Sequence, residues 1–303
     1  MTSRLLVRAD GSVTRGLGHV LRCVALAEEA RSRGLDTLFV VGTDATAERA
    51  LADRSEAFRT VESDDRSWLD DLVDTDLVVI DGPELYTAVS AIRERGARVA
   101  VIDDADGDHP DAQVVVAADR TVASSAASHQ VRLLGPAHAL VRREFRDHRG
   151  LAVEPPTEVL TLLGGTDPGG QLAAVAAAVA NRLPAMSVRP LRIAAAEQGG
   201  VAAALVAGGA AVSAAGTAAW ELLCVGVPSA LVVAAEDQYE PARLIADAGA
   251  ALVLGTVDDA LATGFAGVEA LTDPDQRARL VEAGLELVDG RGAERVLDAL
   301  LAS

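Results

Sequence analysis

Short apolar runs alternate with helical patterns along this chain, and the alternation restricts the fold more than any other feature. Residues 19–33 place apolar side chains on one helical face and end before Gly34, and residues 88–95 end in the same way before Gly96. Strands that alternate with helices form parallel βαβ units, so the first half predicts a doubly wound sheet. Four apolar runs bounded by Gly, Asp or Pro read as its buried strands: residues 4–8, 37–41, 76–81 and 98–104.

A charged stretch near the middle of the chain, "RREFRDHRGLAVEPPTE", precedes a second series of the same alternation. The run "TEVLTLLGG" begins that series, and an alanine-rich helical pattern follows it. A chain of 303 residues is also long enough for two cores. We therefore expect an N-terminal domain over residues 1–150 and a C-terminal domain over 151–303, with the last helix a candidate to pack back on the N-terminal domain.

Composition and charge exclude several classes of protein. The net charge of −18 argues against a nucleic-acid partner or an anionic membrane surface, and arginine without lysine leaves guanidinium groups and backbone amides as the anion binders. No apolar run is long enough to span a membrane, and Met1 to Leu6 do not resemble a signal peptide, so we expect a cytoplasmic protein without membrane insertion. Cys23 and Cys224 are too few for a disulfide framework and match no zinc spacing, so reduced, buried thiols are expected.

A glycine-bearing turn joins a strand to a helix once in each half of the chain. The first is "RADGSVTRGLGHVLRC" and the second is "TEVLTLLGGTDPGG". In open α/β sheets, ligands bind beyond the carboxyl ends of the strands, where helix N-termini offer amides to anions and glycine permits close approach. The turns are therefore candidate ligand sites, with Gly16 and Gly18 in the first and Gly164, Gly165 and Thr166 in the second, although glycine turns also serve plain packing.

His19 directly follows Gly18 and should open the first helix of the chain. The helix dipole disfavours an imidazolium there, so we expect a ring that is neutral at pH 7 and able to act as a general base. The alternative is a histidine that caps the helix or donates one hydrogen bond to a phosphate. The other histidines, at positions 109, 129, 138 and 148, stand in polar or turn-like contexts that favour solvation, and they predict no metal site.

The pattern of the first turn is similar to that of a known family. Its residues Arg8, Asp10, Gly16, Gly18, His19, Arg22, Leu26 and Ala27 resemble the opening of the UDP-sugar hydrolase of pseudaminic acid synthesis and the related spore-coat polysaccharide glycosyltransferase-like proteins. The stretches "VIDDADGDHPDAQVVV", "LLGPAHALVRREF", "LLGGTDPGG" and "SAAGTAAWELLCVGVPSALVVAAEDQ" resemble later parts of the family in the family's order. The resemblance runs from Arg8 to beyond Gln238.

The resemblance implies a GT-B fold, in which two Rossmann-like doubly wound domains face each other across a cleft. It implies that the C-terminal domain binds the nucleotide diphosphate and that Glu221 accepts from the ribose hydroxyls; the alternative for Glu221 is a favourable charge in a helix's first turn. It implies a UDP-sugar as substrate, with no cofactor and no metal. The diphosphate site would comprise Gly164, Gly165, Thr166, Ser213, Ala215, Gly216 and Thr217, and the sugar side Arg8, Asp81, Asp237 and Gln238.

In the family's hydrolase, the histidine that matches His19 activates a water that attacks the anomeric carbon, and UDP leaves. The resemblance therefore implies hydrolysis, with Asp10 as a candidate to orient the ring. The alternative is a GT-B glycosyltransferase in which His19 deprotonates a small-molecule acceptor. A non-catalytic nucleotide-sugar sensor is disfavoured because His19 and the phosphate turns are retained.

The sequence departs from the family near the expected sugar. The family's Asp-x-Tyr reads Asp81, Gly82, Pro83 here, with Tyr86 three residues late, and its Asn-Gln pair reads Asp237 and Gln238. Ala117, Ala118 and Asp119 replace the family's asparagines, and the segment between residues 183 and 213 is short for the family. The sequence therefore predicts nucleotide binding more firmly than it predicts the sugar.

Overall fold

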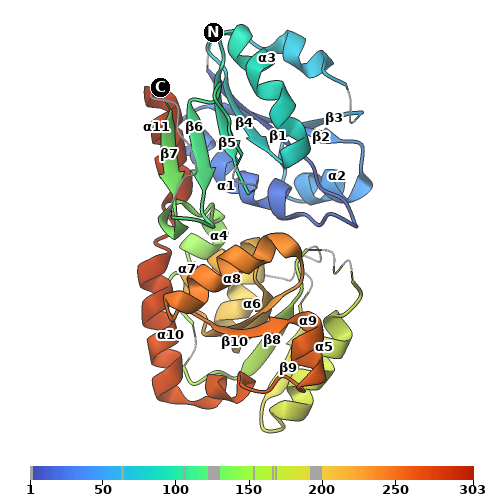
Figure 1. The fold of residues 1–303 in the computed structure, drawn as a ribbon, viewed down its shortest axis with the longest axis vertical. Coiled ribbons are helices and arrows are strands. Elements are labelled where there is room, and N and C mark those ends of the chain that lie inside the picture. Colours follow the sequence, from blue (N-terminus) through green and yellow to red (C-terminus); the bar gives the residue numbers. More distant parts are fainter. Residues whose placement is uncertain are drawn as a thin grey trace. The chain divides into compact units, whose positions relative to one another are not determined.

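The computed structural model describes residues 3–62, 65–104, 107–121, 130–152, 154–165, 167, 169–191 and 200–303. The chain packs into two compact units (Figure 1). Unit 1 comprises Met1–Leu140 together with Arg291–Ser303, and unit 2 comprises Val141–Gly290. The chain therefore leaves unit 1 ten residues before the expected boundary (150 − 140), and its last helix belongs to unit 1.

Unit 1 is built on a sheet of seven strands in the order β3-β2-β1-β4-β5-β6-β7, and every pair is parallel. The inner strands are buried on both faces, which explains their continuous apolar sequences. The expected strands of the first half are all present. The strands are β1 (Arg4–Ala9), β2 (Asp36–Gly42), β3 (Phe58–Val61), β4 (Leu77–Asp81), β5 (Arg98–Ile102), β6 (Val114–Ala117) and β7 (Val131–Leu134).

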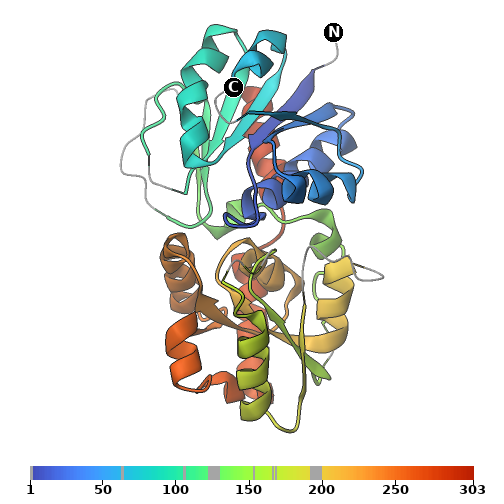
Figure 2. The ribbon, with the colours of Figure 1, turned by 90° about the vertical axis from the view of Figure 1, so that its right-hand side faces the viewer.

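Helices connect and cover these strands, as parallel pairing requires. The α-helices of unit 1 are α1 (Gly18–Ser32), α2 (Ala45–Ala52), α3 (Val89–Glu94) and α11 (Gly292–Ala302), with 3₁₀ turns η1 (Ser67–Asp71), η2 (Pro83–Ala88) and η3 (Pro136–His138). Trp68 is buried in the core between strands and helices. Helix α11 packs against α1, β5 and β6, and both ribbon views show it, in red, beside the strands of unit 1 (Figures 1 and 2).

Unit 2 contains a five-stranded sheet in the order β12-β11-β10-β8-β9, again with every pair parallel. Its strands are β8 (Glu158–Leu162), β9 (Ser187–Pro190), β10 (Gly209–Ala214), β11 (Ser229–Val233) and β12 (Leu252–Thr256). Its helices are α4 (Arg143–Arg146), α5 (Leu172–Arg182), α6 (Gly200–Gly208), α7 (Thr217–Val225), α8 (Tyr239–Asp247), α9 (Val257–Ala262) and α10 (Pro274–Leu287), with η4 (Glu236–Gln238) and η5 (Val268–Thr272).

The strand orders give each sheet one switch point, where the chain turns from building one half of the sheet to building the other. In unit 1 the switch point lies between β1 and β4, because β2 and β3 extend the sheet on one side and β5 to β7 on the other. In unit 2 it lies between β8 and β10. Ligands of doubly wound proteins bind beyond the carboxyl ends of the strands at such points.

Within the described residues, no helix is both long enough and apolar enough to cross a bilayer. Cys23 and Cys224 are free and buried, as expected from the sequence.

Candidate functional site

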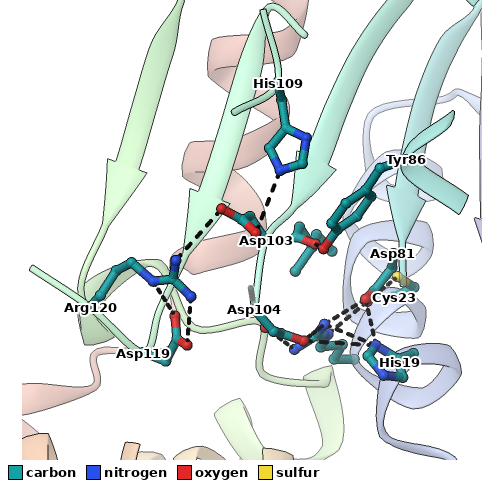
Figure 3. Close-up of polar contacts among 11 residues, drawn as sticks. His19, Cys23, Asp81, Tyr86, Asp103, Asp104, His109, Asp119 and Arg120 are labelled. Carbon is teal, nitrogen blue, oxygen red and sulfur yellow. Dashed lines mark hydrogen bonds and ion pairs between the residues drawn. The ribbon is translucent and has the colours of Figure 1, made fainter. Parts of the chain in front are cut away.

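His19 lies at the switch point of unit 1, in the first turn of α1. Its ring nitrogen Nδ1 lies 2.7 Å from Oδ1 of Asp81, the last residue of β4 (Figure 3). The two residues are 62 positions apart in sequence and meet because β1 and β4 are neighbours. The His19 side chain is 19% exposed, whereas Asp81 is fully buried. The sheet thus places an imidazole at the surface of unit 1 with a buried carboxylate behind it.

The charge of Asp81 fixes which nitrogen of His19 can accept a proton. Although burial raises the pKa of Asp81, the charges and hydrogen bonds of Arg22 and His19 hold it well below its ordinary value. An ionised carboxylate only accepts, so Nδ1 carries the hydrogen and Nε2 is the acceptor in the neutral ring. This is the arrangement that a histidine general base requires.

The pKa of His19 shifts in the direction opposite to the one expected from the helix dipole. Burial lowers the pKa of His19, but the charge and hydrogen bond of Asp81, together with Asp104, outweigh it and raise the pKa above 6.5. Arg22 acts in the opposite direction. A carboxylate in direct contact therefore outweighs burial in its effect on the pKa of the ring.

Arg22, one turn further along α1, donates to both Asp81 and Asp104. Ligand atoms of His19, Asp81 and Asp104 lie within 4.8 Å of one another, a spacing that could hold a metal ion. The guanidinium of Arg22 lies between the carboxylates of Asp81 and Asp104 and balances part of their negative charge.

Asp10 does not orient His19, contrary to the expectation. Its carboxylate accepts from the Nη1 and Nη2 of Arg8 and from the backbone N–H of Gly42, at the end of β2. Arg8 is 2% exposed, so it is enclosed in this ion pair and does not face a sugar. Asp81, also expected on the sugar side, is committed to His19, Arg22 and the thiol of Cys23. The structure therefore moves the orienting role from Asp10 to Asp81.

A second polar cluster follows β5 and β6 in unit 1 (Figure 3). His109 is buried, contrary to the expected solvation, with Nε2 3.5 Å from Oδ1 of Asp103 and its ring edge-on to Tyr86. Arg120 pairs with Asp119 at 3.1 Å and approaches Asp103 at 3.6 Å. The Tyr86 hydroxyl donates to the carbonyl of Ile102 at 2.7 Å, so it is held by the fold rather than offered to a substrate.

The remaining histidines give no further site among the described residues. His138 and His148 are half-buried, and each Nδ1 contacts a backbone carbonyl, of Leu134 and Glu144 respectively. His129 lies outside the described residues, as does Thr166 of the second glycine turn.

The first glycine turn is a narrow loop closed by backbone hydrogen bonds. Ser12 and Gly16 donate to each other's carbonyls at 3.1 and 2.8 Å, and Gly16 has φ of +84°, which favours glycine. Gly18 begins α1, whose N-cap, Leu17, offers no side-chain hydrogen bond. The turn thus leads directly into the N-terminus of α1, where His19 is the second residue.

In unit 2, the two predicted phosphate turns leave neighbouring strands at the switch point. Gly164 and Gly165 follow β8, with Gly164 at φ of +75°, and Ala215 and Gly216 lead from β10 into α7. Ser213 is fully buried and its hydroxyl donates to the carbonyl of Ala214, so it stabilises the turn rather than facing a ligand.

The helices that follow these turns differ at their N-termini. The carboxylate of Asp167 accepts from the N–H groups of Gln171 and Leu172, so the start of α5 already has an anion of its own. Helix α7 begins after Gly216, and no side chain of the described residues caps it. The start of α7, at Thr217, is therefore the better place in unit 2 for an external phosphate.

Glu221 is 2% exposed and is not available to a ribose in this structure. Its two oxygens accept from Nε and Nη2 of Arg142 at 2.7 and 3.0 Å. Arg142 also donates to Glu144 and stacks on the ring of Phe145. A buried carboxylate requires such a partner, but Arg142 is 79 positions from Glu221 and no local pattern identifies the pair. The ion pair joins α7 to the segment that begins unit 2.

Gln238 and Asp237 follow β11. The Oε1 of Gln238 accepts from the N–H of Ala234 at 3.0 Å, and its Nε2 lies beside Gly216, where an added Cβ would come within 3.3 Å. Asp237 is exposed. Gln238 therefore lies next to the start of α7, whereas the exposed side chain of Asp237 faces solvent.

No protein-family model and no curated protein matches the chain. Solved structures do resemble it over its whole length. The spinosyn forosaminyltransferase SpnP superposes with a TM-score of 0.67 at 15% identity, and MurG of Acinetobacter baumannii with 0.64 at 16%, each covering 100% of both chains. The spinosyn rhamnosyltransferase SpnG, complexed with thymidine diphosphate, gives 0.63 at 12%, covering 99% of this chain and 100% of that one.

At such identities the likeness establishes the fold alone. Two α/β domains with parallel sheets of seven and five strands, together with these neighbours, give the chain a GT-B fold. The fold expected from the resemblance is confirmed.

Proposed function

We propose that this protein transfers a glycosyl group from a nucleoside diphosphate sugar to a small-molecule acceptor, with His19 as the general base. The contact of His19 with Asp81 at the switch point of unit 1 carries the proposal. Nε2 of His19 takes the proton of the attacking hydroxyl as that oxygen bonds to the anomeric carbon. The bond from that carbon to the diphosphate breaks, and its electron pair leaves with the diphosphate.

Unit 2 supplies groups that suit the leaving diphosphate. The glycine turn at Gly164, which has a positive φ, and the start of α7 present backbone amides. A helix N-terminus also favours the negative charge that grows on the diphosphate as the bond breaks. Removal of one such preorganised donor typically lowers rates by about 10²–10³. Solved structures with this fold carry thymidine diphosphate or UDP, which supports a nucleoside diphosphate as the ligand.

The similar structures named as spinosyn rhamnosyl- and forosaminyltransferases, one of them complexed with spinosyn aglycone, favour an organic acceptor. Hydrolysis of a UDP-sugar is the second candidate, because the pattern around Gly16, Gly18, His19 and Arg22 resembles that of a UDP-sugar hydrolase. In that case water takes the place of the hydroxyl, and His19 has the same role. Neither candidate assigns a cofactor.

The experiment is to incubate the protein with UDP- and TDP-sugars, with and without a panel of hydroxyl and amine acceptors, and to follow nucleoside diphosphate and free sugar. Release of diphosphate that depends on an acceptor supports transfer. Acceptor-independent release with an equal amount of reducing sugar supports hydrolysis. If the protein binds the diphosphates but cleaves no donor in the panel, the proposed reaction is wrong.

The base is tested with His19→Asn and Asp81→Asn, and His148→Asn in unit 2 is the control. Loss of a general base lowers turnover by about 10²–10⁴. Asp81→Asn should lower it comparably, because an amide can hold the ring in the wrong tautomer. All three variants should bind diphosphate like the wild type. Wild-type turnover by His19→Asn would refute the assignment of the base.

A further inference from the structure

The guanidinium of Arg22 lies between carboxylates at the ends of two neighbouring strands. Its Nε donates to Oδ2 of Asp81 at 2.6 Å, and its Nη1 donates to Oδ1 of Asp104 at 3.0 Å. Its Nη2 also contacts both carboxylates and lies 3.1 Å from Nδ1 of His19. Arg22 is therefore the cation next to the ring and lies on the same helix.

We infer that Arg22, held between Asp81 and Asp104, is a positioning residue that keeps the contact of His19 with Asp81 in its proton-accepting form. The inference rests on the proposed function, in which His19 is the base. Arg22 would act through Asp81 and through its charge, without touching the substrate.

The geometric part of this role is to fix the Asp81 carboxylate. Oδ2 of Asp81 accepts from Nε of Arg22 and from the thiol of Cys23, at 2.6 and 3.3 Å. The other oxygen, Oδ1, is then directed at Nδ1 of His19. A carboxylate that is held on one side cannot rotate away from the ring, so the tautomer with Nε2 unprotonated is maintained.

The electrostatic part is to oppose two negative charges that face the ring. Asp81 faces it from β4, and an oxygen of Asp104, which follows β5, lies 3.9 Å from Nδ1. Two carboxylates without a cation would stabilise the imidazolium, and an imidazolium cannot accept a proton. Arg22 is a positive group beside the ring. Despite the cost of burial, its pKa is raised well above its ordinary value by Asp104 and Asp81. Its guanidinium therefore stays positively charged at neutral pH.

The test is an NMR titration of the His19 imidazole in the free protein, with His19→Asn used to assign its signal. Arg22→Gln removes the positive charge, so the pKa of His19 should rise above the wild-type value. Asp104→Asn removes a negative charge, so the pKa of His19 should fall below it. Arg31→Gln is the matched control, because Arg31 lies on the same helix and also forms a two-pronged pair, with Glu56, away from the ring.

The acid limb of the pH profile, where kcat/KM rises as His19 loses its proton, should shift by the same amount as the pKa of His19. On the acid side of that limb, each pH unit of displacement changes the neutral fraction of the ring, and hence the rate, about tenfold. Arg22→Lys keeps the charge but loses the fork, so its limb should stay near the wild-type pH while kcat falls. A purely structural role would lower activity without displacing the limb.

If the pKa of His19 rises in Arg22→Gln and falls in Asp104→Asn, the inference is supported. If the pKa shifts in the same direction in both variants, or in neither, the inference is overturned. If Arg22→Gln does not fold, as judged by Trp68 fluorescence in a Trp220→Phe background, two results decide the matter in the same way: a lower pKa of His19 in Asp104→Asn, and an unmoved acid limb in Arg22→Lys. The titration needs no substrate. Opposite displacements together with full activity of His19→Asn would therefore refute the proposed function while leaving the effect of Arg22 on the ring established.

Discussion

Replacement of Glu221 with glutamine should destabilise unit 2 and leave unit 1 unchanged. Glu221 and Arg142 are each about 2% exposed, and two hydrogen bonds join them. Loss of one partner of a buried ion pair typically costs about 3–5 kcal/mol. Arg142 keeps its contact with Glu144, and glutamine keeps the shape of the side chain, so we expect the lower end of this range, about 3 kcal/mol.

The chain offers a reporter for each unit, because its two tryptophans are Trp68 in unit 1 and Trp220 in unit 2. Urea unfolding followed by fluorescence in a Trp68→Phe background reports unit 2, and the Trp220→Phe background reports unit 1. With a slope of roughly 2 kcal/mol/M, the midpoint of unit 2 should fall by about 1.5 M. The midpoint of unit 1 should not move.

Glu240→Gln is the control for the loss of one acidic group, because Glu240 forms an exposed pair with Arg243 in the same unit and its loss should leave the midpoint unchanged. The opposite result for Glu221→Gln would be an unchanged midpoint with weakened binding of UDP or TDP. That result would refute the argument from burial and would favour Glu221 as a ligand of the ribose hydroxyls.

Three further outcomes follow from the structure. Because the pKa of His19 is raised above 6.5 and only the neutral ring accepts a proton, kcat/KM should increase with pH through a midpoint above 6.5, and Asp81→Asn should move that midpoint to lower pH in a pH–rate profile. Gly292→Ala should destabilise unit 1 by about 1–3 kcal/mol in urea unfolding, because its Cβ would lie 2.2 Å from the carbonyl oxygen of Ala139. Asp44→Ala removes the side chain that accepts from Thr46 N–H at the start of α2, so the same assay should show a loss of about 0.5–2 kcal/mol.

Local patterns in the sequence predicted the elements and the turns well. Continuous apolar runs marked the buried strands, and glycine marked the turns that lead into α1 and α5. His19 at the start of a helix could be predicted because three consecutive features, a strand, a glycine turn and a helical pattern, lie side by side in the sequence. Such features depend on neighbouring residues and on elementary backbone geometry.

The partners of the charged residues could not be predicted in the same way. Asp81 meets His19 because β4 pairs with β1, and the sequence alone does not give strand order. Asp10, only nine positions from His19 (19 − 10), is drawn instead to Arg8 and the end of β2. Glu221 and Arg142 are separated by 79 positions, and their burial depends on how α7 packs. Strand pairing and helix packing between distant parts of the sequence, rather than local patterns, determine which carboxylate pairs with which cation.

The return of α11 to unit 1 affects how the protein can be made. Arg98 of β5 donates to the carbonyls of Leu300 and Leu301, and Arg33 at the end of α1 pairs with Asp298. Residues 1–140 emerge from the ribosome first. Their sheet is covered only after the last residues, Arg291–Ser303 with helix α11, have also emerged. The continuous unit 2 can complete its fold during that interval, so on the ribosome the second-made unit is the first able to mature.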